Sequence, residues 1–516
     1  MKKGLFLHLS VLAILIAFIS SCSKTTEYTN AIPTDATSVV ALNLKSLGEK
    51  AGIGDKENKE ALQKLTDVLK NEMNAATFQQ LETVLKDPNK AGIDLKSPVY
   101  LFNTPNMKAA LVAKVSNEDD LENLLQVTEK EQISSAVAEG DGYRYATLSN
   151  QAILAFTPSA LVMVSYSGEA QLENAKGQVS NLLKQTAEQS IANSEGFKKA
   201  MKKNGEINVF IALNELSDSY AQMMKQRLPN SENWEEMFLL GSLNFEKGEI
   251  NFEAEWYTNN DELRKKLEQQ AKATTRPIQN NLLKYFPQSS LALFSMGING
   301  EEVFKYLQEN EDFQKSISMK QFNDLKVFFD AFQNDITIGL INVTMQNAPA
   351  FLAYAEAKNN DVLKALYEKK NELGLQRGTD IIRLNENEYV YKSRKLNVFF
   401  GIKDKTFYAT NDELLYKSIG KASDPSAAKA EYASEIKGKN MAFIINIESI
   451  CSLPVVKMLA QFGGQQAASA LSLCDNLTYL KVTGDIQKAN FSLKMKNKEV
   501  NSLKQIVNFA RQFAGM

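Results

Sequence analysis

Histidine is nearly absent from this chain of 516 residues, since the sequence has one, His8. His8 lies in the first 21 residues, which we interpret below as a removable leader. A mature chain without histidine has no Ser-His-Asp triad, no Cys-His nucleophile pair and no His-ligated metal site. The sequence therefore excludes the commonest nucleophilic hydrolases, and we expect neither a metal nor a cofactor.

Cysteine is also scarce, and the three cysteines are Cys22, Cys451 and Cys474. No CxxC pair or similar metal-binding spacing occurs. In an exported protein, Cys451 and Cys474 can form a disulfide. The alternative is two small buried residues, because a free cysteine packs like a small hydrophobic side chain. Both interpretations stay open at this point.

Charge of neither sign is in excess, because 59 basic residues face 61 acidic ones and the formal net charge is −2. So small an imbalance does not support nucleic-acid binding or a polybasic membrane patch. A composition of 44% hydrophobic and 23% charged residues is that of a folded globular protein. At 516 residues the chain is too long for one ordinary core, so at least two domains are expected.

The N-terminus carries the most specific pattern in the chain. Lys2 and Lys3 precede an apolar run at residues 5–19, and two serines then lead to Cys22. A basic start, a short apolar core and small residues are typical of a secretory leader, and the run is shorter than the ~20 residues of a membrane span. A cysteine directly after two small residues resembles the lipobox of bacterial lipoproteins, which are cleaved before the cysteine and acylated on it. The pattern predicts a signal peptide at 1–21, lipid attachment at Cys22, and a tether at 22–31.

Four stretches repeat one pattern, a short apolar run, an asparagine, acids and then helical periodicity. They lie at residues 109–121, 250–263, 349–363 and 489–500. Each predicts a strand that leads into a helix capped by the asparagine, with acids at the positive end of the helix dipole. The capping candidates are Asn117, Asn259 or Asn260, Asn359 or Asn360, and Asn497.

The order of predicted elements repeats about halfway along the chain. A β-α-β-β-α unit, three closely spaced strands and a second hairpin with a helix occur in residues 32–272 and again in 286–516. Closely spaced strands with turn residues between them indicate an antiparallel meander. Residues 114–121 align with 356–363 without a gap. We therefore predict an α+β fold with two tandem pseudo-repeats, each an antiparallel sheet covered by helices, joined by a linker at 273–285.

The leader, Cys22 and the opening Ile32-Pro33-x-Asp35-Ala36-x-x-Val39 resemble those of uncharacterised cell-envelope lipoproteins from Bacteroidota. That family carries a domain-of-unknown-function label and has members of similar length. The resemblance implies a lipid-anchored protein of the cell envelope, at the outer membrane, and it supplies no catalytic or binding residues. No acid occurs between Cys22 and Glu27, which favours the periplasmic over the surface-exposed face.

Few residues suggest chemistry, and each has a structural alternative. Glu232, Glu235 and Glu236 surround Trp234, as in a glycosidase site or a sugar-binding surface, but this spacing also suits an exposed helix start. Gly463-Gly464 is interpreted as a helix C-terminus, because no Lys-Ser/Thr follows as in a phosphate loop. The aromatic stripe at 322–332 has helical spacing and is interpreted as core.

The sequence favours a non-enzymatic lipoprotein that is anchored to the membrane through Cys22 and presents its two repeats to another envelope component. An envelope protein is the expected partner, and nucleic acid is not. One alternative is a hydrolase that uses carboxylates and acts on glycans, which needs no histidine. Another alternative is a carrier for an apolar ligand, which requires a large apolar cavity.

Overall fold

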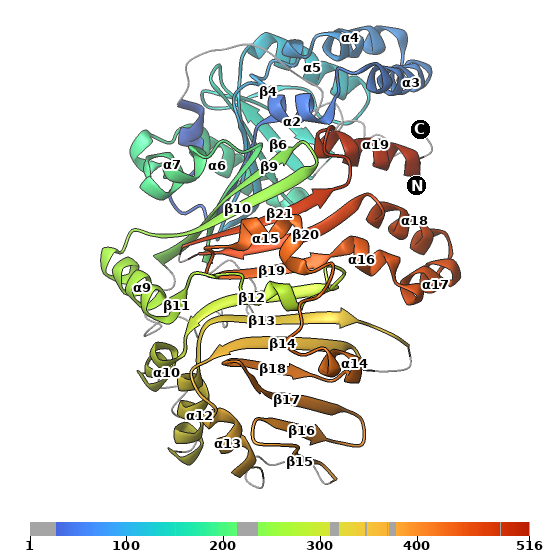
Figure 1. Ribbon diagram of the computed structural model, residues 1–516. Helices are drawn as coiled ribbons and strands as arrows, with labels where there is room; N and C mark the ends of the chain where they lie inside the picture. The colour runs from blue at the N-terminus through green and yellow to red at the C-terminus, as the bar shows by residue number, and fades with distance from the viewer. Residues whose placement is uncertain are drawn as a thin grey trace. The chain divides into compact units, whose positions relative to one another are not determined.

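The computed structural model describes residues 27–149, 151–213, 236–309, 319–345, 348–368, 370, 378–485 and 487–514. The described chain forms two compact units (Figure 1). Unit 1 comprises residues 27–213, 236–259 and 499–514, and unit 2 comprises residues 260–498. Each unit is a mixed α/β structure around an antiparallel sheet, which confirms the predicted combination of helices with antiparallel strands.

The sheet of unit 1 has the strand order β4-β5-β6-β7-β3-β2-β1-β8-β9-β10, and each pairing is antiparallel. The strands are β1 (Ser38–Leu42), β2 (Val99–Thr104), β3 (Met107–Lys114), β4 (Ala138–Glu139), β5 (Arg144–Leu148), β6 (Ala152–Phe156), β7 (Ala160–Ser165), β8 (Ile207–Ala212), β9 (Met237–Glu246) and β10 (Glu249–Thr258).

Helices cover both faces of this sheet, because successive side chains of its central strands point to opposite sides. In β3, Val112 belongs to one buried cluster, with Val179 of α6 and Phe197 of α7. The next residue, Ala113, belongs to a second cluster with Leu121 of α5. The helices are α2 (Leu44–Ala51), α3 (Lys56–Glu72), α4 (Ala75–Lys86), α5 (Glu118–Lys130), α6 (Leu172–Leu183), α7 (Glu195–Met201) and α19 (Ser502–Ala514), with 3-10 turns η1 (Glu27–Ala31), η2 (Pro88–Ala91), η3 (Glu169–Gln171), η4 (Ala187–Gln189) and η5 (Ile191–Asn193).

The sheet of unit 2 has the order β15-β16-β17-β18-β14-β13-β12-β19-β20-β21, again antiparallel throughout, and β11 pairs with the end of β12. The strands are β11 (Thr275–Arg276), β12 (Ala292–Asn299), β13 (Phe332–Asn342), β14 (Ala350–Ala357), β15 (Asp380–Arg383), β16 (Glu388–Lys392), β17 (Asn397–Lys403), β18 (Thr406–Thr410), β19 (Met441–Asn446), β20 (Leu477–Gly484) and β21 (Lys488–Met495).

The core of unit 2 alternates in the same way. Tyr354 of β14 packs into one buried cluster with Tyr432 and Phe286, and the next residue, Ala355, packs into another with Leu363. The helices are α9 (Asp261–Thr274), α10 (Gly300–Glu309), α12 (Met319–Ala331), α13 (Asp361–Glu368), α14 (Glu413–Lys417), α15 (Glu431–Ile436), α16 (Ile447–Ser452), α17 (Pro454–Phe462) and α18 (Gly464–Cys474), with 3-10 turns η8 (Leu283–Tyr285) and η9 (Ala427–Lys429).

The two strand orders correspond strand by strand, and hydrogen bonds at equivalent places correspond as well. The N–H of Thr34 donates to the carbonyl of Gln189 over 3.1 Å, and that of Gln288 donates to the carbonyl of Pro425 over 3.0 Å. Isolated bridges at Pro33–Ser190 and Pro287–Ser426 accompany these bonds. The opening segment of each unit is therefore bonded in the same manner to the segment just before η5 in unit 1 and just before η9 in unit 2.

In each unit, the last hairpin of the sheet is followed by a helix that belongs to the other unit. The helix α9 follows the β9–β10 hairpin but belongs to unit 2, and α19 follows the β20–β21 hairpin but belongs to unit 1. The chain passes from unit 1 to unit 2 between residues 259 and 260, and it returns between 498 and 499. Consequently α9, which follows β10, packs on α10 and β12 of unit 2, and α19, which follows β21, packs on α2 and β9 of unit 1 (Figure 1). The linker predicted at 273–285 stays a prediction from the sequence pattern.

The predicted asparagine caps are correct for three of the four repeated stretches. Asn117 accepts the N–H groups of Asp119 and Asp120 at the start of α5, and Asn260 does the same for α9. Asn359 accepts the N–H of Asp361 over 3.1 Å. The prediction for Asn497 is wrong, because α19 begins later, at Ser502. There Asn501 accepts the N–H of Leu503 over 2.9 Å.

Candidate functional site

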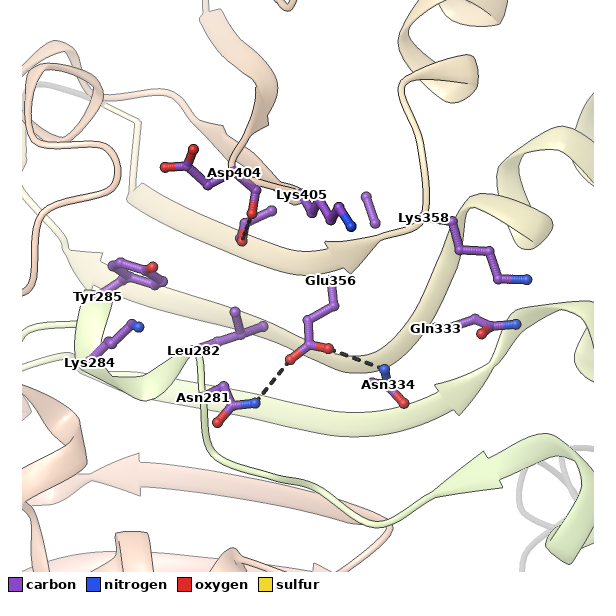
Figure 2. Close-up of a pocket in the computed structure, with 12 residues that line it drawn as sticks. Asn281, Leu282, Lys284, Tyr285, Gln333, Asn334, Glu356, Lys358, Asp404 and Lys405 are labelled. Carbon is purple, nitrogen blue, oxygen red and sulfur yellow. Dashed lines mark hydrogen bonds between the residues drawn. The ribbon is translucent and has the colours of Figure 1, made fainter.

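A pocket of about 370 Å³ opens on unit 2, where four chain segments meet. They are the residues at η8, the start of β13, the end of β14 and the turn between β17 and β18. Figure 2 shows the side chains of these segments around Glu356, which lies near the middle of the group. The pocket is therefore built by residues far apart in the sequence, which the antiparallel pairing of β13, β14 and β18 brings together.

Glu356 is held by amide groups. The side-chain amides of Asn281 and Asn334 each donate to one of its carboxylate oxygens over 3.2 Å (Figure 2). Asn334 has a φ of 65°, a left-handed conformation that asparagine tolerates better than most residues. Among the described residues, no ion pair to Glu356 is present in the structure. Its carboxylate is thus positioned without being neutralised.

A tight turn supplies two more charged side chains. Lys403 pairs with Thr406, so Asp404 and Lys405 form a two-residue hairpin turn with φ values of 50° and 59°. Such turns require left-handed conformations at both positions. Aspartate adopts this conformation readily, whereas for lysine it costs roughly 1 kcal/mol. The turn places both side chains at the pocket.

Asp335 is a buried carboxyl group behind the pocket. It is 1% exposed, and its oxygens accept the N–H of Gln279 (2.9 and 3.0 Å) and the N–H of Asn280 (2.9 Å). Burial raises the pKa of Asp335 despite these bonds, and the charge of Glu356 adds to the rise. Because both oxygens are already engaged, the carboxyl group holds the loop before η8 and does not face a ligand.

Aromatic rings form one side of the pocket. The ring of Tyr285 lies 4.6 Å from that of Tyr354, measured between centroids, and the Nζ of Lys284 lies 5.0 Å from the Tyr285 centroid. Tyr354 is 3% exposed, and this burial raises the pKa of its hydroxyl to about 12. Tyr285 is half-buried, so part of its ring is exposed to the pocket while the ring packs against that of Tyr354.

On the opposite side, Lys358 forms an ion pair with Glu301, which lowers the pKa of that glutamate. With Lys284 and Lys405, the pocket therefore has three lysines and two acids among its lining residues. The lining is predominantly polar, and it contains both hydrogen-bond donors and acceptors.

The equivalent place in unit 1 holds an ion pair between two of the chain's own side chains. Lys114 pairs with Ala160 in the register in which Glu356 pairs with Thr406. The Nζ of Lys114 lies 3.0 Å from Asp94, with side chains only 14% and 10% exposed. Burial tends to raise the pKa of Asp94, but hydrogen bonds from the Lys114 ammonium, the N–H of Lys96 and the Ser97 hydroxyl outweigh it and hold the pKa below its usual range.

The residues predicted from the sequence lie elsewhere. Cys22 is outside the described residues. Cys451, in α16, and Cys474, the last residue of α18, are free thiols. Burial, with a smaller effect from the neighbouring Cys474, raises the pKa of Cys451 to about 11. The fold therefore brings the two together, and a disulfide between them stays a prediction.

The other candidates do not form a site with the pocket. Glu232, Trp234 and Glu235 are outside the described residues, and Glu236 is exposed just before β9. The prediction for Gly463 is confirmed, because it caps the C-terminus of α17. In the aromatic stripe, Phe332 is buried as predicted, but Phe328 is 43% exposed.

Within the part of the chain that the structure describes, no group of three or more His, Cys, Asp or Glu side chains could hold a metal ion. No helix in that part is both long enough and apolar enough to cross a membrane. Sequence reasoning missed the pocket altogether. One signal for it was available in the sequence. The gap-free alignment matches Lys114 with Glu356, so the charge at this position is reversed between the two predicted repeats.

Comparisons with known proteins place the chain in a family. A search of curated proteins found no match. A solved structure, "Structure of crystal form I of TP0453", is similar at 13% sequence identity and a TM-score of 0.24, over 49% of this chain and 88% of that one. This likeness is too low to support an argument. The model of a domain of unknown function, DUF4836, matches residues 28–503, and the chain therefore belongs to the DUF4836 family.

Proposed function

We propose that the protein is a lipid-anchored binding protein of the cell envelope, and that the pocket of unit 2 takes a small hydroxyl-rich ligand such as a short glycan. One observation carries the binding role. In unit 1, Lys114 at the matched position forms an ion pair with Asp94, whereas in unit 2 the carboxylate of Glu356 is held by two amides at a pocket. Such a difference between matched positions is expected where only one of the two units binds a ligand.

The ligand class follows from the lining. Asn281, Asn334 and Gln333 supply amides that both donate and accept, Glu356 accepts, and Tyr285 adds an aromatic ring. Hydroxyl groups match such a mixture, because each hydroxyl is a donor and an acceptor at once. A volume of about 370 Å³ falls within the range of small-molecule sites. The polar lining favours this ligand class over the apolar ligand of a carrier.

A binding role is favoured over glycan hydrolysis by the state of the carboxyl groups. Hydrolysis needs two carboxyl groups that flank the bond to be cleaved, with the acid partner at a raised pKa. Asp335 has a raised pKa, but its oxygens are bonded to the N–H groups of Gln279 and Asn280. It is therefore unsuited to donate a proton to a ligand.

We also propose that the two units arose by internal duplication. The support is the matched strand order and the matched hydrogen bonds at Thr34 and Gln288. The exchange of α9 and α19 then has a simple interpretation. The helix after the last hairpin of each sheet packs against the helix that follows the first long strand of the other unit. These pairs are α19 with α2 and α9 with α10.

The ligand proposal is tested with a glycan array of envelope polysaccharide and peptidoglycan fragments. The probe is the labelled chain from residue 23 onward, which lacks only the leader and Cys22. We expect retention on a subset of glycans, and at least tenfold weaker retention for Glu356→Lys, which places a cation where both asparagines donate. Glu413→Lys makes the same charge change on the exposed start of α14 and should bind like the wild type. No retention, or equal loss in both variants, would overturn the ligand proposal.

The anchor is tested separately in cells. Cys22→Ala removes the predicted acylation site, and we expect the protein to leave the membrane fraction. Each buried CH₂ of an acyl chain contributes ~0.8 kcal/mol of membrane affinity, so its loss has a large effect. Cys474→Ala is the matched control, because it removes a thiol without touching the leader. Unchanged membrane attachment of Cys22→Ala would contradict the anchor.

A further inference from the structure

A second surface of unit 2 is unusually poor in charge. Residues 449–474, which include α17 and α18, contain one charged residue, Lys457, between Glu448 and Asp475. Acids and bases make up 23% of the whole chain, so about six would be expected in 26 residues. The helices α16, α17 and α18 connect β19 to β20 in the sequence, and in Figure 1 they form a group beside these two strands.

The charge-poor helices expose large apolar side chains. Phe462, at the end of α17, is 83% exposed, and Leu459, one helical turn earlier, is 59% exposed. Leu473 of α18 is 43% exposed. Residues three apart on a helix lie on the same face, so Phe462 and Leu459 form one apolar surface. Isolated exposed apolar residues are common, but a cluster on packed helices indicates a docking surface.

The equivalent connection in unit 1 differs in composition. There the sequence between β8 and β9 contains Glu215, Asp218, Glu232 and Glu235. Residues 449–474 contain no acid at all. The long acid-free stretch at residues 449–474 is therefore specific to the connection in unit 2, and it is not a feature of this position in the strand order.

We propose that α17 and α18 dock on a lipid surface, with Phe462 and Leu459 inserted among the headgroups and acyl chains. A surface without acids approaches anionic lipid headgroups without repulsion, and Lys457 is attracted to them. At nine residues, α17 is about 13 Å long and far too short to span a bilayer, so it lies at the interface.

This inference rests on the proposed anchor at Cys22, which makes the membrane the partner nearest to the chain. From the predicted acylation site Cys22 to the first described residue, Glu27, five residue steps extend at most ~17 Å. Such a short tether keeps the folded chain at a high effective concentration near lipid, which adds to the affinity that the surface has by itself.

The test is co-sedimentation of the chain from residue 23 onward with vesicles of phosphatidylethanolamine and phosphatidylglycerol. We expect the wild type to sediment with vesicles and the variant Leu459→Ser/Phe462→Ser to partition at least about tenfold less, because two large apolar groups lose their insertion energy. Leu414→Ser is the matched control, since Leu414 is 76% exposed on α14 of the same unit. It should partition like the wild type.

A second readout reports on the site itself. In Phe462→Trp, we expect fluorescence that is quenched by brominated lipid to a greater extent than in the wild type, which contains two tryptophans. The proposal is overturned if the wild type stays in the supernatant, if Leu414→Ser loses as much partition as the double variant, or if the added tryptophan is not quenched. Wild-type self-association that the double serine variant abolishes, without vesicle binding, would assign the surface to a second copy instead.

Discussion

At one matched position of their sheets, the two units carry side chains of opposite charge, Lys114 in unit 1 and Glu356 in unit 2. In unit 1, Lys114 neutralises Asp94 inside the protein. In unit 2, Glu356 is held by two amides and faces an open pocket. The same strand order therefore accommodates either charge, and we propose that this position serves stability in unit 1 and ligand binding in unit 2. The following predictions test this contrast, from the largest effect to the smallest.

The largest effect is expected from Lys114→Glu, which gives unit 1 the residue of unit 2. It places a second carboxylate beside Asp94, where the lost ion pair was largely buried. Breaking such a pair leaves an uncompensated charge, so we expect a loss of about 3 kcal/mol in the free energy of unfolding. Denaturant titration of both variants measures this. The matched change in unit 2, Glu356→Lys, should cost less than about 1 kcal/mol, and equal losses would contradict the contrast.

Oxidation of Cys451 and Cys474 should have a comparable effect confined to unit 2. We propose that an oxidising compartment forms the disulfide, because the two free thiols are neighbours in the fold. Closing a loop of this length stabilises by about 3 kcal/mol in the chain-entropy account. Thermal unfolding with and without reductant measures the gain, and Cys474→Ser should remove the response to reductant. Two titratable thiols in protein purified without reductant would contradict this prediction.

The helix caps should differ modestly between the units. Asn117 accepts two N–H groups of α5, whereas Asn359 accepts one, at the start of α13. Replacing a capping asparagine by alanine costs about 1 kcal/mol on average. We therefore expect a larger fall in unfolding free energy for Asn117→Ala than for Asn359→Ala. A larger loss from the second change would show that the acceptor count does not set the cost.

The pH dependence should have opposite signs at the two buried carboxyl groups. The pKa of Asp94 is lower in the folded protein than in the unfolded chain. Its stabilising contribution is therefore present above the pKa of the unfolded chain and is lost as the pH falls through the pKa of the folded protein. The pKa of Asp335 is raised in the folded protein from its ordinary value of 3.8. Its stabilising contribution is therefore present below pH 3.8 and is lost as the pH rises through the pKa of the folded protein.

Unfolding midpoints from pH 3 to pH 7 test these signs. As the pH rises, the unfolding midpoint of Asp94→Asn should fall further below that of the wild type. The difference in unfolding midpoint between the wild type and Asp335→Asn should shrink or change sign over the same range. Equal slopes for the two variants would contradict the assignment of opposite environments.

The strands were predictable because their pattern is local. In β3, β10, β14 and β21, apolar runs end near an asparagine and acids, and these elements occur where the sequence places them. The cap at Asn501 was missed because the chain between β21 and α19 is irregular, and no local pattern fixes its length. The destination of α9 and α19 depends on tertiary packing, which the sequence pattern does not encode.

The pocket was not predictable for the same reason. Asn281, Asn334 and Glu356 lie in separate segments, and only the register of β13, β14 and β18 joins them. An isolated Glu356 looks like any strand residue. The sequence held one relevant sign, the reversal of charge between Lys114 and Glu356, and its meaning depends on the ion pair and the amides that the structure shows.

Hydrogen-deuterium exchange tests the central contrast most directly, with a glycan that the array retains. The account predicts added protection in unit 2 at the segments that line the pocket, 281–285, 333–334, 356–358 and 404–406, and none at the matched region around Lys114. Glu356→Lys should abolish this protection. Protection of both units, or of the Lys114 region alone, would contradict the claim that only the open position binds.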